Sequence, residues 1–320
     1  MTKIMTVTGP ISPKELGFCQ PHEHLMISQG VSATVNPALC IDDIGRSAAE
    51  AAQFRAMGGN TIIDAQPGGC NRVAEALVQI SCDTGVNIVA STGVHKHIFY
   101  PKDHWIFTQE QDVLRDVFIH ELTVGMYTNI DVTLSREYIP SCAGIIKIAY
   151  DLEGLTPVYD KCFKAAAEAA RECDVPMMIH IEQGSGAGRL LDTLISWGVN
   201  PRKVMFCHMD REIMPLSFYV PFLEKGIALE FDTIGRFKYH SDEDEAVLIK
   251  GLIDMGYEDQ ILCSLDTTRE RLKAYNPSGV GLCHLFTSFF PLLKAYGVAD
   301  RQIRKISHDN IVRVFTSMAL

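Results

Sequence analysis

Short apolar runs alternate along this chain with segments in which apolar residues recur at helical spacing. Eight runs have the length and composition of buried strands: 19–25, 60–66, 87–93, 143–150, 176–182, 204–210, 227–233 and 260–266. Amphipathic helical spacing is found between them, in the segments 48–57, 73–84, 159–173, 188–197 and 242–255. This alternation predicts an α/β fold, a (β/α)8 TIM barrel, because repeated strand–helix units build a parallel sheet with helices on its outside.

A doubly wound open sheet would show the same alternation of strands and helices. Its glycine-rich nucleotide-binding turn is missing after the first predicted strand, so the barrel is the better prediction. No low-complexity stretch, block of charge or flexible linker divides the chain, and residues 1–320 are therefore predicted to form a single domain. After the eighth strand we expect an extra helical segment at about 283–297 and then the closing helix of the barrel at 303–316.

Composition and charge narrow the class of protein. A hydrophobic content of 47% with 21% charged residues is that of an ordinary globular protein with a substantial core. No apolar run reaches the ~20 residues of a membrane span and the N-terminus lacks a signal-peptide core, so the cytoplasm is the expected location. A formal charge of -10 argues against a general nucleic-acid-binding surface, and ten cysteines without a C-x-x-C pair suit reduced core thiols.

Residues that commonly bind metal stand at the ends of five predicted strands. His22 and His24 flank Glu23 on the first strand, where alternate side chains share a face, so both imidazoles can bind one ion while Glu23 faces away. By itself this triplet is equally compatible with a loop or with hydrogen-bonded core histidines. The other candidates end the fourth, fifth, sixth and eighth strands: Lys147, His180, His208 and Asp266. Six ligand-type groups at one barrel mouth suit two metal ions.

Lys147 is the most informative of these residues because it lies in the apolar run Gly-Ile-Ile-Lys-Ile-Ala. Burial disfavours its ammonium form, so the free amine becomes available to take up carbon dioxide as a carbamate. The resulting anion has two oxygens and can bridge two cations about 3.5 to 4 Å apart. The alternative is a barrel lysine paired with a carboxylate such as Asp64 or Glu230.

Together these positions resemble the phosphotriesterase family of the amidohydrolase superfamily. The resemblance consists of His-x-His on the first strand, Lys on the fourth, His on the fifth and sixth, and Asp on the eighth, and it extends from Gly17 to about Thr316. The pair Gly17-Phe18 before the histidines, the stretch 89–93 and the pair Asp309-Asn310 also look like features of this family.

The resemblance implies a binuclear metal-dependent hydrolase that acts on ester bonds. The ligands implied for the more buried ion are His22, His24 and Asp266. Those implied for the more exposed ion are His180 and His208. N-carboxylated Lys147 would bridge the two ions, which are expected to be zinc, with manganese or cobalt as alternatives. A hydroxide shared by the ions would attack the substrate, and Asp266 would pass its proton to the leaving group as the catalytic acid–base.

One position departs from the organophosphate-degrading members of the family. They have a histidine where Thr233 stands, and it serves a proton relay with an aspartate just after the sixth strand, here Asp210. Without that histidine, efficient hydrolysis of phosphotriesters is not expected. The lactonase branch of the family, which opens cyclic esters, is therefore the better comparison.

The loops after the predicted strands indicate the substrate class. The candidates for substrate binding lie in three loops. Lys238 follows the seventh strand, and Arg269, Arg271 and Tyr275 follow the eighth. His95 and Lys96 follow the third strand. Loops after strands seven and eight form the usual phosphate site of this fold, and arginine offers a forked donor for phosphate. These loops are also similar to those of family members that open phosphorylated furanose lactones. Alternatively, the arginines are solvated or paired with acids such as Glu270.

The leading hypothesis is a lactonase that opens a phosphorylated aldono-1,4-lactone. A promiscuous carboxylesterase or phosphotriesterase with the same metal centre is the alternative, and a non-catalytic metal-binding barrel is a more distant one. The expected partner is a small anionic molecule rather than nucleic acid or a membrane, and a homodimer is the default for a closed symmetric assembly.

Overall fold

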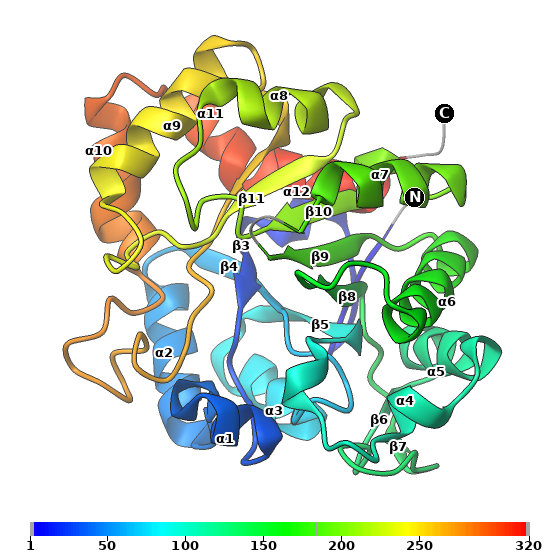
Figure 1. Cartoon of the computed structure of the whole chain (residues 1–320). Coiled ribbons are helices and arrows are strands. Elements are labelled where there is room, and N and C mark those ends of the chain that lie inside the picture. Colours follow the sequence, from blue (N-terminus) through cyan, green and yellow to red (C-terminus); the bar gives the residue numbers. More distant parts are fainter. Residues whose placement is uncertain (1–2, 183–184, 318–320) are drawn as a thin grey trace.

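The computed structural model describes residues 3–182 and 185–317, and its centre is an eight-stranded parallel sheet ringed by helices (Figure 1). In sheet order the strands are β3 (Phe18–Glu23), β4 (Gly59–Asp64), β5 (Asn87–Val94), β8 (Ile145–Tyr150), β9 (Met177–Ile181), β10 (Val204–Cys207), β11 (Ala228–Phe231) and β12 (Ile261–Cys263). All eight predicted strands are present, and the predicted (β/α)8 barrel is confirmed. Several strands end two or three residues early, so that His24, His208 and Asp266 lie just beyond them.

Helices cover the outside of the barrel (Figure 1). The longer ones are α2 (Ile44–Ala56), α3 (Ala74–Thr84), α5 (Gln111–Thr123), α6 (Pro157–Cys173), α7 (Ala187–Ser196), α8 (Leu216–Glu224) and α9 (Asp242–Asp254). The shorter ones are η1 (Pro13–Leu16), α1 (Val31–Val35), η2 (Pro37–Leu39), η3 (His97–Phe99), α4 (Trp105–Thr108), η4 (Pro201–Lys203), η5 (Glu258–Gln260), η6 (Leu285–Phe289), α10 (Phe290–Ala295), α11 (Asp300–Arg304), η7 (Lys305–Asp309) and α12 (Asn310–Thr316). Helices η6 and α10 occupy the segment where the sequence predicts an extra helix. Within the described ranges, no helix is both long and apolar enough to cross a membrane.

Two small antiparallel hairpins lie outside the barrel sheet and were not predicted. Strands β1 (Ile4–Thr6) and β2 (Gly9–Ile11) form the first, and β6 (Met126–Tyr127) and β7 (Tyr138–Ile139) form the second. Strands of two or three residues are too short to show an alternating pattern in the sequence. The first hairpin is anchored to the barrel, because the amide of Val7 donates to the carbonyl of Ile88 at 2.8 Å.

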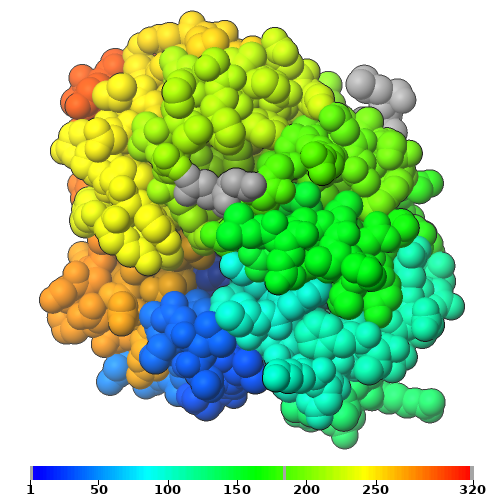
Figure 2. Space-filling view, in the orientation of Figure 1, coloured from blue at the N-terminus to red at the C-terminus, as the bar shows by residue number. Residues whose placement is uncertain are grey.

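The interior of the barrel is filled with side chains. Ile63, Val89, Ile145, Met178 and Leu262 come from five different strands, are fully buried, and belong to one apolar cluster to which α12 also contributes. This layer makes the barrel a packed core rather than a pore, and it leaves the C-terminal ends of the strands as the place for a site. In the space-filling view, loops from the blue, cyan, green and orange parts of the chain surround a central hollow (Figure 2).

The barrel closes between β12 and β3 through side chains as well as backbone. The amide of His22 donates to Ser264 Oγ at 2.9 Å, and the amide of Asp266 donates to the carbonyl of His22 at 3.0 Å. Glu23 reaches the same segment, where its Oε1 accepts hydrogen bonds from Ser264 Oγ at 2.8 Å and from the amide of Leu265 at 2.9 Å. The middle residue of the His-Glu-His triplet therefore fixes the segment that carries Asp266 against the two histidines.

Gly93 allows β5 to pass close to Lys147. Its φ is +119°, and a Cβ placed there would lie 1.9 Å from the carbonyl oxygen of Lys147. We expect Gly93→Ala to lower the free energy of unfolding by about 3–5 kcal/mol, because the methyl group must push β8 away and the backbone is strained. Gly58→Ala is the matched control, since Gly58 has a φ of +99° and nothing within 4 Å of its Cβ position. Denaturant unfolding that gives equal losses for the two variants would show that the close approach to Lys147 is not what requires glycine.

Candidate metal centre

The six predicted metal ligands lie together near the C-terminal ends of the strands, although Lys147 lies inside β8 rather than at a strand end as predicted. They are all buried: His22, His24, Lys147, His180, His208 and Asp266. The ring centroid of His208 lies 5.0 Å from that of His22 and 4.4 Å from that of His180. His24 Nε2 is 3.4 Å from Asp266 Oδ1. The structure therefore brings the residues together from β3, β8, β9 and the segments after β10 and β12.

Two of these residues have a strained backbone. His208 has a φ of +62° and Asp266 a φ of +46°, both in the left-handed region that side chains with a Cβ rarely adopt. Such conformations cost roughly 1–3 kcal/mol each and persist where the surroundings hold them. Here the amide of His208 donates to Asp232 Oδ2 at 3.0 Å, which helps to hold its turn. Backbone strain at two of the predicted ligands supports the interpretation of this region as a functional site.

Carboxylates behind two of the imidazoles fix their orientation. His22 Nδ1 lies 3.0 Å from Glu230 Oε2 and 3.1 Å from Asp232 Oδ2, and His208 Nδ1 lies 2.7 Å from Asp232 Oδ1. An imidazole that donates its Nδ1–H in this way leaves Nε2 free to bind a metal ion. The sequence places both acids at the end of the seventh strand, but it gives no rule that assigns either one to a particular histidine.

His180 has a carboxylate partner of a different kind. Its Nε2 lies 3.1 Å from Glu182 Oε2, which leaves Nδ1 free for a metal ion. Burial lowers the pKa of His180 to about 3, so its ring is neutral, as metal binding requires. Glu182 also accepts from Lys96 Nζ at 2.8 Å and faces Arg211 Nη1 at 3.5 Å. Sequence reasoning missed Glu182 and Arg211; the available signal was that each follows a ligand histidine by two or three residues.

Lys147 is fully buried and has no carboxylate partner among the described residues. Its Nζ lies 3.3 Å from His22 Nε2 and 3.8 Å from Cys207 Sγ, and no acid of the described ranges is within ion-pair distance. Asp64, considered as a partner from the sequence, instead accepts hydrogen bonds from backbone amides at 2.8 and 3.0 Å. Glu230, the other candidate, is bonded to His22. A buried ammonium without an anion is costly, so the arrangement favours a neutral or modified lysine.

Excess negative charge at the centre fits bound cations. Burial lowers the pKa of His22, but the negative charges of neighbours such as Glu230 and Asp232 raise it well above its ordinary value. Among the described residues, four groups of side chains have possible ligand atoms within 4.8 Å of one another, and two of these groups contain Asp266: His22, His24 and Asp266, and His208, Asp232 and Asp266. His180 belongs to none of the four groups. Because Asp266 belongs to two of the groups, the residues fit two neighbouring ions better than one.

Asp266 has a cationic neighbour in Arg236, which the sequence shows as one of the basic residues of the loop after the seventh strand but does not pair with Asp266. Arg236 Nη2 lies 3.1 Å from Asp266 Oδ2 and also donates to the backbone carbonyl of Asp266. Burial raises the pKa of Asp266, but Arg236 and the nearby histidines outweigh this and hold the pKa well below its usual range. Asp266 is therefore a carboxylate, the form that can bind a metal ion and accept a proton.

Thr233 occupies a buried polar cluster behind the centre. Its amide donates to Asp210 Oδ2 at 2.6 Å, and its hydroxyl lies 3.0 Å from His240 Nε2. The threonine thus contacts the aspartate that the family resemblance pairs with a histidine at this position. His240 comes from the loop after β11. Within the described ranges it makes no contact with Asp266 at ion-pair distance, so it does not supply the imidazole that Thr233 lacks.

The predicted substrate-binding residues of the loops after β11 and β12 fall in different environments. Lys238 is exposed, with its Nζ 4.8 Å from the ring centroid of Tyr239. Arg269 Nη1 donates to Asp42 Oδ1 at 2.7 Å, and its guanidinium carbon lies 4.9 Å from the ring centroid of Tyr275. These two cations keep charge near solvent, as binding of an anion requires.

Arg271 and Tyr275 hold loops in place. Arg271 Nη2 donates to the carbonyls of Ile234 at 2.6 Å and Leu265 at 2.9 Å, which ties the loop after β11 to that after β12. The hydroxyl of Tyr275 donates to the carbonyl of Asp43 at 2.6 Å. Both side chains have structural partners, and their part in substrate binding stays a prediction.

His95 and Lys96 border the metal centre on the β5 side. His95 Nδ1 accepts from the amide of Lys96 at 2.7 Å, so the neutral ring carries its proton on Nε2. Burial, followed by the charge of His180, lowers the pKa of His95 well below its ordinary value. The His95 and His180 ring centroids are 5.8 Å apart, and Lys96 Nζ is bonded to Glu182. Contact of these two residues with substrate also stays a prediction.

The fold and the site together define the class of protein, a TIM barrel of the amidohydrolase type with a centre suited to two divalent metal ions. The model of the phosphotriesterase family matches residues 2–315, and the chain belongs to this family. The resemblance inferred from the histidines, the lysine and the aspartate is thereby confirmed.

Known relatives cover the whole barrel. A phospho-furanose lactonase from Mycoplasmopsis synoviae is 28% identical over 97% of this chain and 90% of its own length. Among solved structures, an amidohydrolase from Mycoplasma synoviae has a TM-score of 0.91 and 27% identity, covering 98% of this chain and 92% of that one. A lactonase from Listeria monocytogenes has a TM-score of 0.88 and 26% identity, covering 99% of this chain and 100% of that one.

Proposed function

We propose that this protein is a metal-dependent lactonase that opens the ring of a phosphorylated sugar lactone. The observation that carries the proposal is the fully buried Lys147, which lies among four histidines and Asp266 with no carboxylate of the described residues paired to it. N-carboxylation of Lys147 would remove the unpaired charge and supply two oxygen ligands at the centre of the site.

The remaining ligands suit the same assignment. His22, His24 and Asp266 would hold one ion, and His180 and His208 the other, with zinc expected and manganese or cobalt as alternatives. Two divalent ions bound there would lower the pKa of a water molecule toward ~7 and polarise the carbonyl of the lactone. The acids behind the rings, Glu230, Asp232 and Glu182, would keep each imidazole in the tautomer that binds metal.

Asp266 is the residue placed to move the proton. Arg236 keeps its carboxylate ionised, so Asp266 can accept the proton released when water attacks the carbonyl carbon. The same proton can then pass to the ring oxygen as the carbon–oxygen bond breaks. The product is a hydroxy acid, and the base is regenerated.

A lactone is favoured over a phosphotriester by two independent observations. Thr233 and its contact with Asp210 stand where the organophosphate-degrading members have a histidine relay. Two relatives that span nearly the whole chain, from Mycoplasmopsis synoviae and Listeria monocytogenes, are named as lactonases. A homodimer and a cytoplasmic location, both expected from the sequence, are parts of the proposal that rest on the sequence alone.

A phosphate group on the substrate is supported by Arg269 and Lys238. The bonds from Arg269 to Asp42 Oδ1 and to the carbonyl of Cys40 both use Nη1. A guanidinium has five N–H donors, so further donors remain for a ligand. Lys238 adds a second exposed cation from the loop after β11, which is the usual side for phosphate in this fold.

Arg269→Ala tests the phosphate assignment. Loss of a charged hydrogen bond should raise KM for the phosphorylated lactone by about 10- to 100-fold and leave KM for the same lactone without phosphate within about threefold. Arg115→Ala is the control, because Arg115 is a surface arginine on α5 paired with Asp116. Equal effects of Arg269→Ala on both substrates would refute the phosphate assignment while leaving lactone opening intact.

A further inference from the structure

Two buried carboxylates lie close together behind the metal centre. Asp210 belongs to the segment after β10, and Glu245 belongs to the first turn of α9. Their possible ligand atoms lie within 4.8 Å of each other, and both side chains are fully buried. Among the described residues, Asp210 Oδ1 and both carboxylate oxygens of Glu245 are buried without a hydrogen-bond partner. We call these two side chains the carboxylate pair.

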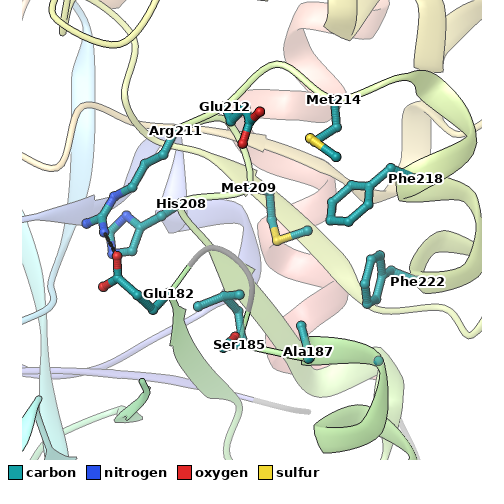
Figure 3. A pocket seen from close by; sticks show the side chains of 13 residues that line it. Glu182, Ser185, Ala187, His208, Met209, Arg211, Glu212, Met214, Phe218 and Phe222 are labelled. Atoms are coloured by element: carbon teal, nitrogen blue, oxygen red, sulfur yellow. Dashed lines mark hydrogen bonds and ion pairs between the residues drawn. The ribbon is translucent and has the colours of Figure 1, made fainter. Parts of the chain in front are cut away.

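The arginines of the neighbouring segments are directed elsewhere. Arg211 follows Asp210 in the chain, but its Nη1 reaches Glu182 Oε1 across 3.5 Å, as the dashed line in Figure 3 shows. Arg236, in the loop after β11, lies 3.1 Å from Asp266 Oδ2. Within the described ranges, no lysine or arginine lies at ion-pair distance from either member of the carboxylate pair. Its negative charge is therefore not neutralised by these side chains.

His240 borders the carboxylate pair, but both of its ring nitrogens already have partners. Its Nδ1 lies 3.1 Å from the carbonyl oxygen of Ser241, and its Nε2 lies 3.0 Å from Thr233 Oγ1. Because a carbonyl can only accept, Nδ1 carries a proton, and Nε2 can accept from the threonine hydroxyl. Nδ1 is also 3.7 Å from Glu245 Oε2, which is too far for a hydrogen bond. The ligand atoms that stay free are therefore carboxylate oxygens.

Two ionised carboxylates so close together inside a protein are costly unless a positive charge lies between them. Burial, followed by the charge of Asp210, raises the pKa of Glu245 well above its ordinary value. A shared proton would bond one oxygen of each carboxyl group and leave the other oxygen of Glu245 buried without a donor. A cation can bind both oxygens of Glu245 together with Asp210 Oδ1. Calcium lies about 2.3–2.6 Å from its oxygen ligands, so two of them can be up to about 5 Å apart, as the observed spacing requires.

We propose that Asp210 and Glu245 bind a hard divalent cation, magnesium or calcium, at a third metal site separate from the metal centre. Oxygen ligands select such ions, whereas the imidazoles of the metal centre suit zinc, and water would complete the coordination. The ion fastens the first turn of α9 to the segment that follows His208. Asp210 Oδ2 also accepts from the amide of Thr233 at 2.6 Å, so the ion steadies the start of the loop after β11 as well. Binding of this ion is independent of the reaction at the metal centre and can be measured without turnover.

Glu245→Gln removes one charge and one ligand oxygen of the carboxylate pair while keeping the size of the side chain. Glu50→Gln is the matched control. Glu50 is also a buried glutamate on a helix, α2, but its Oε1 accepts from the amide of Ala274 at 2.6 Å. The control therefore makes the same chemical change at a glutamate that is held by the backbone.

The experiment counts ions by element in the zinc-loaded protein after dialysis against magnesium or calcium, tested separately, and desalting. Counting by element keeps zinc at the metal centre apart from the third ion. The unchanged protein and Glu50→Gln should retain about one magnesium or calcium ion per chain, and Glu245→Gln at least about tenfold less, with equal zinc in all three proteins. The retained ion should raise the Tm of the unchanged protein by about 2–5 °C and that of Glu245→Gln by less than about 1 °C.

Failure of the unchanged protein to retain either ion would overturn the third site, and that measurement requires no variant to fold. Equal retention by Glu245→Gln and the unchanged protein would also overturn it, because the ion would then lie elsewhere. If no ion is retained and the Tm of Glu245→Gln equals or exceeds that of the unchanged protein, the carboxylate pair shares a proton. The amide of glutamine then replaces the O–H donor of a protonated Glu245.

Discussion

Lys147→Ala should leave the barrel folded but almost without bound metal, and should reduce turnover by at least about a thousandfold. The substitution removes the group at the centre of the site, to which His22 Nε2 approaches within 3.3 Å. The free energy of unfolding should change little. The cavity left by the side chain is destabilising, but removal of a buried amine that has no anionic partner within the described ranges is stabilising, and the two effects oppose each other. Elemental analysis of the reconstituted variant gives the metal content per chain, and a rate assay gives the turnover.

Lys203→Ala is the control for this prediction. Lys203 is also a buried lysine, but its Nζ lies 2.6 Å from Asp174 Oδ1, in the segment before β10 and away from the strand ends. Its loss should lower the free energy of unfolding and leave metal content and turnover per folded chain unchanged. Two bound metals and near-normal turnover in Lys147→Ala would rule out the lysine bridge.

Asp266→Asn should lower kcat by about 10² to 10⁴-fold, because an amide cannot accept the proton that Asp266 is placed to receive. The asparagine is nearly the same size, so the contacts of its backbone with His22 and Arg236 should persist. Measured on two esters, the loss should be smaller for an aryl ester than for an alkyl ester. A phenoxide leaves without the proton that an alkoxide needs.

A matched control for this variant is Asp131→Asn. Asp131 accepts from the amide of Asn71 at 2.7 Å and contacts no predicted ligand among the described residues. It should leave kcat within about twofold of normal. If Asp266→Asn slows both esters equally and also loses metal, Asp266 is a metal ligand without a role in proton transfer.

The barrel and its ligand positions could be predicted from the sequence for simple geometric reasons. Parallel strands are buried on both faces and therefore read as apolar runs, and the ends of these runs converge at one mouth. His180, His208 and Asp266 each end such a run, so their proximity follows from the fold. Several predicted strands overran the observed ones, because buried apolar residues continue past the end of the strand, as Leu265 does before Asp266.

The partners of the ligands could not be predicted in the same way. The pairing of His22 with Glu230 and of His208 with Asp232 depends on the direction of side chains across neighbouring strands, which no spacing in the chain specifies. Arg236 and Arg271 illustrate the same limit within loops. Both were visible as loop arginines, but only the structure places Arg236 on Asp266 and Arg271 on backbone carbonyls.

Lactone opening at the metal centre can be tested in one assay. A pH indicator follows acid release by the metal-reconstituted protein from one sugar lactone, offered with and without a phosphate group. We expect acid release that favours the phosphorylated form, disappears on chelation and returns when metal is restored. Two bound metals with no acid release from either lactone would show that the centre does not open lactones.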